Sequence, residues 1–109
     1  MIVNDDTVSK ALQYLSEDPH PLALAQKSVL FAEKAKDEAF AVLFLAAEGT
    51  KDERKCAAEI DPLFKTARQT EIDAQTELAR HKRRAEAAEK IISVWQTENA
   101  NARAAERVR

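Results

Sequence analysis

The sequence predicts an all-α fold: a long antiparallel helical hairpin of the coiled-coil type, preceded by a short helix. Only one Gly and three Pro occur among 109 residues, whereas an average chain has roughly 7% Gly and 5% Pro. Few turns are therefore available, so the helices should be few and long. No segment alternates β-branched or aromatic residues with polar ones, so no strand is expected. At this length, residues 1–109 are expected to form a single helical domain.

A short first helix is expected over residues 4–17. Asn4 can accept hydrogen bonds from the free amides of the first turn, and the charges of Asp5 and Asp6 suit its positive end. Apolar residues then recur at helical spacing on one face. They are Val8, Ala11, Leu12 and Leu15. The segment Pro19-His20-Pro21 ends this helix, because each proline disfavours helical geometry in the residue before it.

The first arm of the hairpin is expected over residues 21–48, and it carries two apolar seams. One seam reads Leu22, Ala25, Val29, Ala32, Lys36, Ala39, Leu43, Ala46, and the second reads Leu24, Phe31, Ala35, Val42, Leu45. Two seams call for contacts on two sides, so a single partner helix would not cover this arm. We therefore expect self-association, with a homodimer completing the fold.

The tightest turn is expected at Gly49, where a helix C-cap needs a left-handed residue. Thr50 follows as an N-cap, with Glu53 three residues later as in a capping box. Such a short connection predicts that the two arms fold back on each other. The pair Asp61-Pro62 again resembles an N-cap followed by a first-turn proline, so a kink or break is expected near residues 61–62.

The return arm is expected over residues 51–100. Its seam reads Phe64, Ala67, Glu71, Ala74, Leu78, His81, Ala85, Ala88, Ile92, Trp95, Asn99. If the chain folds about Gly49, Leu22 lies near Glu77 and the return arm overshoots the first arm. The first helix is expected to cover this overhang, with Val8, Leu12 and Leu15 opposite Ile92, Ala88 and Ala85. Residues 101–109 are polar and rich in Ala and Arg, and they are expected to fray.

Two short blocks of the sequence resemble a known family. They are Glu48-Gly49-Thr50-x-x-Glu53-Arg54-Lys55 at the hairpin and Ile92-x-x-Trp95-x-x-x-Asn99 after a long Ala/Glu/Arg helix. Over residues 25–100 the chain resembles small helical proteins of bacteriophages and prophages, which often accompany phage genes for recombination or single-strand annealing. The resemblance implies an accessory role in phage DNA recombination or replication, in the cytoplasm of a bacterial host. It brings no catalytic motif.

The net charge of −2 hides a difference between the two halves of the chain. Residues 1–64 hold 7 Lys and Arg against 12 Asp and Glu, a net of −5, and residues 65–109 hold 10 against 7, a net of +3. The halves should attract each other in an antiparallel pair, and the second half alone favours a polyanion.

The basic run Arg80, Lys82, Arg83 and Arg84 is the main candidate for contact with nucleic-acid phosphates, which makes single-stranded DNA a candidate partner. Consecutive residues, however, spread around a helix, and charge runs usually form a solvated surface, which is the alternative. No aromatic residue except Trp95 stands near the run, so base stacking has little support.

Two further sites have two interpretations each. Arg54 and Lys55 form either a docking corner at the hairpin tip, as the resemblance implies, or surface pairs with Asp52 or Glu59. Trp95, together with Ile92, is either an interface anchor for a partner or part of the packing against the first helix.

Polar residues also occur in the seams. Lys36, Glu71 and His81 either form a buried network that specifies register or extend their long side chains to solvent. Cys56 is expected to be a small seam residue rather than a reactive thiol.

The sequence gives no support for an enzyme. His20 and His81 have no Cys, Ser or Asp at a nucleophile or metal spacing, and no Gly-rich phosphate loop occurs, so neither catalytic, cofactor nor metal residues are expected. No stretch approaches the roughly 20 apolar residues that cross a bilayer, and the amino terminus lacks a signal-peptide pattern. Two other functions remain open: a small inhibitor of a host or anti-phage defence protein, and a purely structural dimer.

Overall fold

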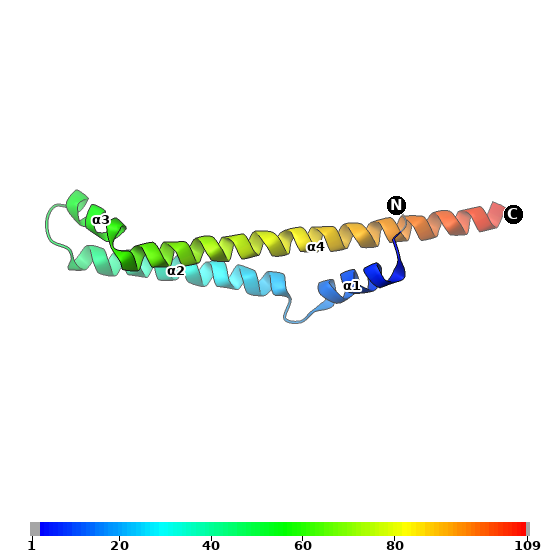
Figure 1. Ribbon diagram of the computed structural model, residues 1–109, viewed down its shortest axis with the longest axis horizontal. Helices are drawn as coiled ribbons and strands as arrows, with labels where there is room; N and C mark the ends of the chain where they lie inside the picture. Colours follow the sequence, from blue (N-terminus) through cyan, green and yellow to red (C-terminus); the bar gives the residue numbers. More distant parts are fainter. Residues whose placement is uncertain (1–2, 109) are drawn as a thin grey trace. The chain divides into compact units, whose positions relative to one another are not determined.

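The computed structural model describes residues 3–108, which form four helices (Figure 1). They are α1 (Asp5–Ser16), α2 (Pro21–Ala46), α3 (Lys51–Ile60) and α4 (Pro62–Val108). The residues so described contain no strand. The all-α class and the helical hairpin predicted from the sequence are therefore confirmed.

The chain divides into two compact units. The hairpin unit is Ala23–Ala79, and the terminal unit combines the residues up to Leu22 with those from Arg80 onward. The long helix α4 contributes its first part to the hairpin unit and the remainder to the terminal unit. Between residues 3 and 108, no helix has both the length and the apolar character needed to cross a membrane.

In the hairpin unit, α2 runs antiparallel to the first part of α4, with the predicted turn between α2 and α3 (Figure 1). Gly49 has a φ of 114°, a conformation that side-chain-bearing residues rarely adopt. Thr50 is the N-cap of α3, and its hydroxyl oxygen accepts a hydrogen bond of 3.2 Å from the backbone N–H of Glu53. These local interactions explain why the chain turns where the sequence predicted.

The expected kink near residues 61–62 is a complete break between α3 and α4. Asp61 is extended, with φ −66° and ψ 135°, and it is the C-cap of α3. Its side-chain Oδ1 accepts a hydrogen bond of 2.8 Å from the N–H of Leu63, and its carbonyl oxygen accepts one of 3.1 Å from Lys65. Asp61 therefore ends one helix and begins the next. In Figure 1, α3 points out of line with α4.

This break corrects the predicted register of the hairpin. A fold about Gly49 would place Lys36 opposite residue 63, but Lys36 forms an ion pair with Glu71. Likewise, Phe40 packs against Phe64, with ring centroids 5.7 Å apart. The expected register is wrong because α3 leaves the line of the hairpin, so α2 meets residues five to eight positions further along the return arm.

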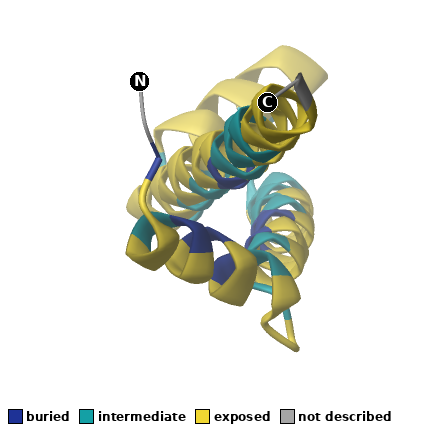
Figure 2. Ribbon diagram, turned by 90° about the vertical axis from the view of Figure 1, so that its right-hand side faces the viewer, coloured by how far each residue is buried: buried dark blue, intermediate teal, exposed yellow. Residues whose placement is uncertain are grey.

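In the terminal unit, α1 packs against the later part of α4, as the sequence predicted. Ala11, Tyr14, Ala85 and Ala88 form the buried cluster, and Leu15, Leu22, Ile91 and Ile92 pack around it. Figure 2 shows buried residues in dark blue on α1. The backbone N–H of Val3 also donates to Glu98 Oε2 at 3.1 Å. Short alanine side chains at these positions permit a close approach of the two helices.

Two details of the terminal unit differ from the expectation. Leu12 was placed on the contact face but is 50% exposed, whereas Tyr14 is buried, with 3% exposure. Leu12 follows Ala11 and therefore points about 100° away around the helix, while Tyr14 lies one turn further on the same face as Ala11. In addition, α4 continues to Val108 rather than ending near residue 100. Residues 97–108 contain no Gly or Pro and several strong helix formers, which explains the extension.

Candidate interaction surfaces

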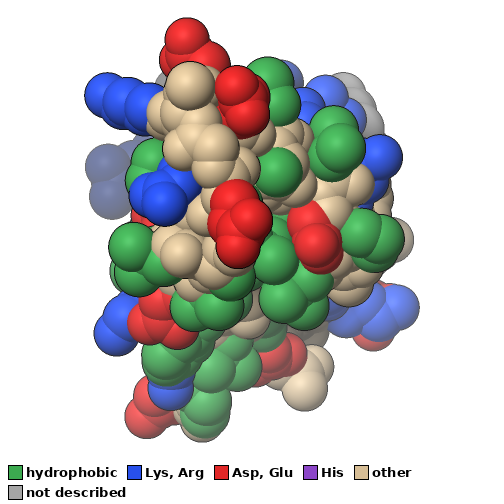
Figure 3. All heavy atoms as spheres, turned by 90° about the vertical axis from the view of Figure 1, so that its left-hand side faces the viewer, with side chains coloured by type: hydrophobic (Ala, Val, Ile, Leu, Met, Phe, Trp, Pro, Cys, Tyr) green, Lys and Arg blue, Asp and Glu red, His purple; other side chains and the backbone are tan. Residues whose placement is uncertain are grey.

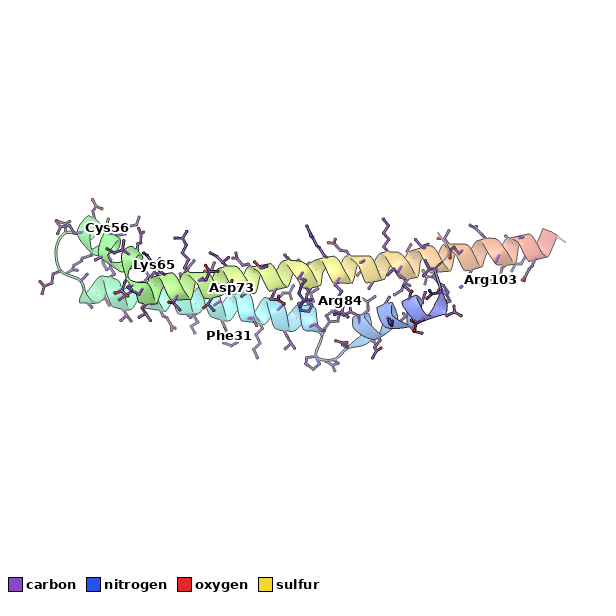
Figure 4. The ribbon with its side chains drawn as sticks, viewed as in Figure 1. Phe31, Cys56, Lys65, Asp73, Arg84 and Arg103 are labelled. Carbon is purple, nitrogen blue, oxygen red and sulfur yellow. The ribbon has the colours of Figure 1, made fainter. Side chains whose placement is uncertain are left out.

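All four basic residues of the run on α4 are exposed, but two of them also make contacts within the terminal unit. Arg84 is exposed, as Lys82 and Arg83 are, but it also lies over the ring of Tyr14, with its guanidinium carbon 4.2 Å from the ring centroid. Figure 4 shows Arg84 on the side of α4 that faces α1. Arg80 Nη2 lies 3.5 Å from Nε2 of His81. Of the four basic residues that the sequence singled out, two thus take part in contacts within the terminal unit.

Tyr14 is the centre of an aromatic cluster that the sequence reasoning missed. Its hydroxyl donates to the carbonyl oxygen of His81 at 3.2 Å and lies 3.2 Å from His81 Nδ1. The His20 ring meets the Tyr14 ring edge-on, with centroids 5.1 Å apart, and His20 Nδ1 accepts a hydrogen bond from the N–H of Leu22 at 3.0 Å. Tyr14 follows Ala11 by three residues and therefore lies on the same face of the helix, so the sequence spacing could have predicted that Tyr14 is buried.

An open hollow of about 220 Å³ lies between α1 and α4 beside Tyr14. Its lining includes Thr7, Lys10, Ala11, Arg84, Ala88 and Ile91. The hollow is small and mostly apolar, and it contains no pair of groups arranged for acid–base or nucleophilic chemistry.

Arg54 and Lys55, at the hairpin tip, have different surroundings. Arg54 lies over the ring of Phe44, with its guanidinium carbon 5.9 Å from the centroid, rather than beside Asp52 or Glu59. Of the two residues proposed as a docking corner, Lys55 is exposed and Arg54 is half-buried.

Cys56 is exposed on α3, which corrects the expectation that it lies in the seam (Figure 4). The buried residue of this helix is Ala58, at 1% exposure. The prediction was wrong because Cys56 lies two residues before Ala58, about 200° around α3 from the buried side of that helix.

Ile92 and Trp95 differ in their surroundings. Ile92 packs against the buried cluster of the terminal unit, so it serves the contact with α1. Trp95 is half-buried, which leaves part of its ring open to a partner. The two residues proposed together as an anchor therefore have separate environments.

Lys36 and Glu71 form an ion pair inside the hairpin unit, and Gln75 Nε2 donates to Glu71 Oε1 at 3.2 Å. Lys36 Nζ lies 2.7 Å from Glu71 Oε2, and the side chains are 28% and 13% exposed. The hydrogen bond that Lys36 donates to the Glu71 carboxylate raises the pKa of Lys36 above its ordinary value of 10.5. These two seam residues thus pair with each other, while the third, His81, contacts Tyr14 in the other unit.

The second apolar seam of α2 remains uncovered, and we name Leu24, Phe31, Ala35, Val42 and Leu45 the outer stripe. Its large members are 47% exposed at Leu24, 62% at Phe31 and Val42, and 76% at Leu45, and Ala35 is exposed as well. Figure 4 shows Phe31 on the side of α2 away from α4. Figure 3 shows further hydrophobic side chains at the surface of the α3 end. The first seam of α2, by contrast, contains the buried residues Ala25, Val29 and Ala32.

Comparison with protein-family models, curated proteins and solved structures returns no match. Within residues 3–108, no three His, Cys, Asp or Glu side chains gather closely enough to hold a metal ion. The surface feature with the clearest chemistry is thus the outer stripe of α2, because large apolar side chains in a contiguous row mark contact surfaces.

Proposed function

We propose that this chain is a non-enzymatic accessory protein that acts through protein–protein contacts, with the outer stripe of α2 as its main contact surface. The observation that carries the proposal is the exposure of Leu24, Phe31, Val42 and Leu45 in one row along a helix. Exposure of such a row of apolar side chains to water is unfavourable, and its burial by a partner stabilises the complex. An amphipathic helix binds other helices or a groove through such spaced anchors.

The proposal includes a biological setting: DNA recombination or replication of a phage or prophage, in the cytoplasm of the bacterial host. Its support is the resemblance of residues 48–55 and 92–99 to small phage proteins. Proteins of that kind accompany recombination and single-strand annealing genes, so a recombination protein is the proposed partner class.

The proposal also includes contact with single-stranded DNA through Lys82 and Arg83. Both side chains are exposed on α4, and residues 65–109 carry a positive balance of charge. Phosphate contacts by such residues give affinity without sequence preference and depend strongly on salt. Arg84 contributes less to this contact because its guanidinium lies over Tyr14.

The protein contact is tested by titrating the purified chain into a purified phage single-strand annealing protein in a calorimeter. Phe31→Glu should abolish the binding heat, while Leu30→Glu should retain it. Leu30 is 66% exposed and Phe31 62%, so the two variants remove similar exposed side chains from different faces of α2. Lack of binding by the unmodified chain, together with binding to a host defence protein, would replace the proposal with the inhibitor function.

The DNA contact is tested by fluorescence anisotropy with a labelled single-stranded oligonucleotide. Lys82→Ala with Arg83→Ala should lower the slope of log K against log salt concentration by about 1.4, because each phosphate contact on a single strand contributes about 0.7. Lys65→Ala with Arg68→Ala removes the same charge from the hairpin unit and serves as the control. Equal losses in the two double variants would mean that net charge, rather than this site, governs binding.

A further inference from the structure

Two polar residues extend the outer stripe of α2 into a regular seam, which we name the outer seam. It reads Leu24, Ser28, Phe31, Ala35, Glu38, Val42, Leu45, with steps that alternate between four and three residues. All seven residues are exposed. This is the spacing that two supercoiled helices bury between them, and it continues over about three heptads.

We propose that the outer seam binds the outer seam of a second copy of the chain, with the two α2 helices antiparallel and a two-fold axis passing near residue 33. The inference rests on the protein-contact role proposed above. It assigns the surface in the free protein to a second copy of the chain, which a recombination protein would have to displace. A two-fold contact uses the same surface on both copies, so the seam must be complementary to itself.

Side-chain size supports this register. Each layer of an antiparallel pair brings together residues whose positions are symmetric about the axis. Ala35 then faces Phe31 of the second copy, and Val42 faces its Leu24. Symmetry repeats both pairs, so four layers place a larger side chain against a smaller one. Such alternation allows facing layers to interdigitate without voids.

Polar groups support the same register. Ser28 faces Glu38 of the second copy. In the chain itself the Ser28 hydroxyl donates to the carbonyl oxygen of Leu24 at 3.1 Å, so on association it rotates to donate to the carboxylate instead. Lys27 is next to Ser28 and brings a positive charge toward that carboxylate. In the chain itself, Lys27 Nζ lies 5.6 Å from the centroid of the Phe31 ring, so this side chain already follows the seam. Polar residues within a seam commonly specify register and orientation.

Other alignments of the same two helices are less favourable. A parallel pair in register would bring Glu38 against Glu38 and Ala35 against Ala35, which combines like-charge repulsion with a void. An antiparallel pair displaced by one heptad would place Glu38 against Ala35 and Ser28 against Leu45. The carboxylate would then be desolvated without a partner, which is costly.

The association is tested by sedimentation equilibrium of the full-length chain under reducing conditions. We expect twice the chain mass for the unmodified protein and for Leu30→Glu. Phe31→Glu should weaken the dimer by on the order of a hundredfold, because it buries an unpaired carboxylate in the seam. Val42→Glu should act in the same way and serves as a second variant. Circular dichroism checks that each variant keeps its helices. A monomeric unmodified chain, or equal effects of Phe31→Glu and Leu30→Glu, would overturn the proposal.

The register is tested at Ser28. In the antiparallel alignment, Ser28→Lys faces Glu38 of the second copy and should tighten the dimer about fivefold, whereas Ser28→Glu should weaken it about tenfold. In a parallel pair, both variants would place like charges against each other and both would weaken it. Weakening by Ser28→Lys would therefore overturn the antiparallel arrangement.

The outcome separates this inference from the proposed function. If the chain is a monomer but still binds the annealing protein through Phe31, the dimer proposal is wrong and the contact surface of the proposed function is retained. If the chain is a dimer but binds no recombination protein, the dimer proposal is supported and the proposed role in phage recombination is wrong.

Discussion

Lys36 on α2 and Glu71 on α4 form an ion pair across the hairpin unit, at an N–O distance of 2.7 Å. The pair lies in a seam that is otherwise mostly alanine and larger apolar residues. Sliding one helix by a turn would separate the two charges and place each beside apolar groups, which is unfavourable. The pair therefore helps to specify the alignment of α2 with α4.

Removal of Lys36 should destabilise the protein. Lys36→Ala leaves the Glu71 carboxylate, which is 13% exposed, without a cationic partner and with only the hydrogen bond of 3.2 Å from Gln75 Nε2 to its Oε1. We expect a loss of about 1–2 kcal/mol in the free energy of unfolding, measured by urea titration with circular dichroism. Lys10→Ala is the control, because the Lys10–Asp6 pair has side chains that are 76% and 78% exposed. Similar losses in both variants would show that the Lys36 pair has no special role.

The contribution of Lys36 should depend on pH in the alkaline range. Glu71 raises the pKa of Lys36 above 10.5 in the folded state. The unfolded chain therefore loses this proton first, so the stabilisation is complete below the unfolded pKa and is lost as pH rises through the folded pKa. The stability difference between the unmodified chain and Lys36→Met should be constant from neutral pH to about pH 9 and shrink above about pH 11. A difference that shrinks toward acid instead would contradict this assignment.

Two neighbouring arginines should have different effects on stability. Arg84→Ala removes a cation–π contact with Tyr14 and should cost about 0.5–1 kcal/mol. Arg83→Ala removes an exposed side chain and should change stability by less than about 0.5 kcal/mol. A double-mutant cycle of Arg84→Ala with Tyr14→Leu measures the coupling directly. Zero coupling would contradict the stacking.

The turn between α2 and α3 should tolerate little change at Gly49. A Cβ at this position would meet the Glu53 side chain, and the φ of 114° is itself unfavourable for Ala. Gly49→Ala should destabilise the chain by about 1 kcal/mol or more, measured by thermal unfolding. Thr50→Ala, which removes the cap of α3, should cost about 1 kcal/mol. Glu48→Ala serves as the control, because Glu48 is exposed and its φ is not positive. A loss from Glu48→Ala as large as that from Gly49→Ala would contradict the special role of the glycine.

The start and end signals of the helices were the best predicted features. Asn4, Thr50 and Asp61 each accept a backbone hydrogen bond at the beginning of a helix, as their side chains suggested. Such caps depend on residues within a few positions of one another, so sequence spacing contains the needed information. The turn at Gly49 was predictable for the same reason.

The relation between distant residues was predicted less well. The Lys36–Glu71 pair depends on where α3 leaves the line of the hairpin, and the direction of a helix after a break is not encoded in spacing. The buried position of Tyr14 depends on its contact with His81, which is 67 positions away. Among the candidate surface residues, Arg84 and Arg54 lie over aromatic rings, and neither partner is close in the sequence. The uncovered outer stripe, in contrast, followed from the periodicity of α2.

The break at Asp61 has a consequence for how this hairpin can vary. Because α2 aligns with residues beyond the break, a helical turn added to or removed from α3 changes the length of the connection and not the pairing of the two longer helices. Segment 51–60 can thus change in length while the alignment downstream is preserved, although such a change alters the burial of Ala58 and the contact of Arg54 with Phe44.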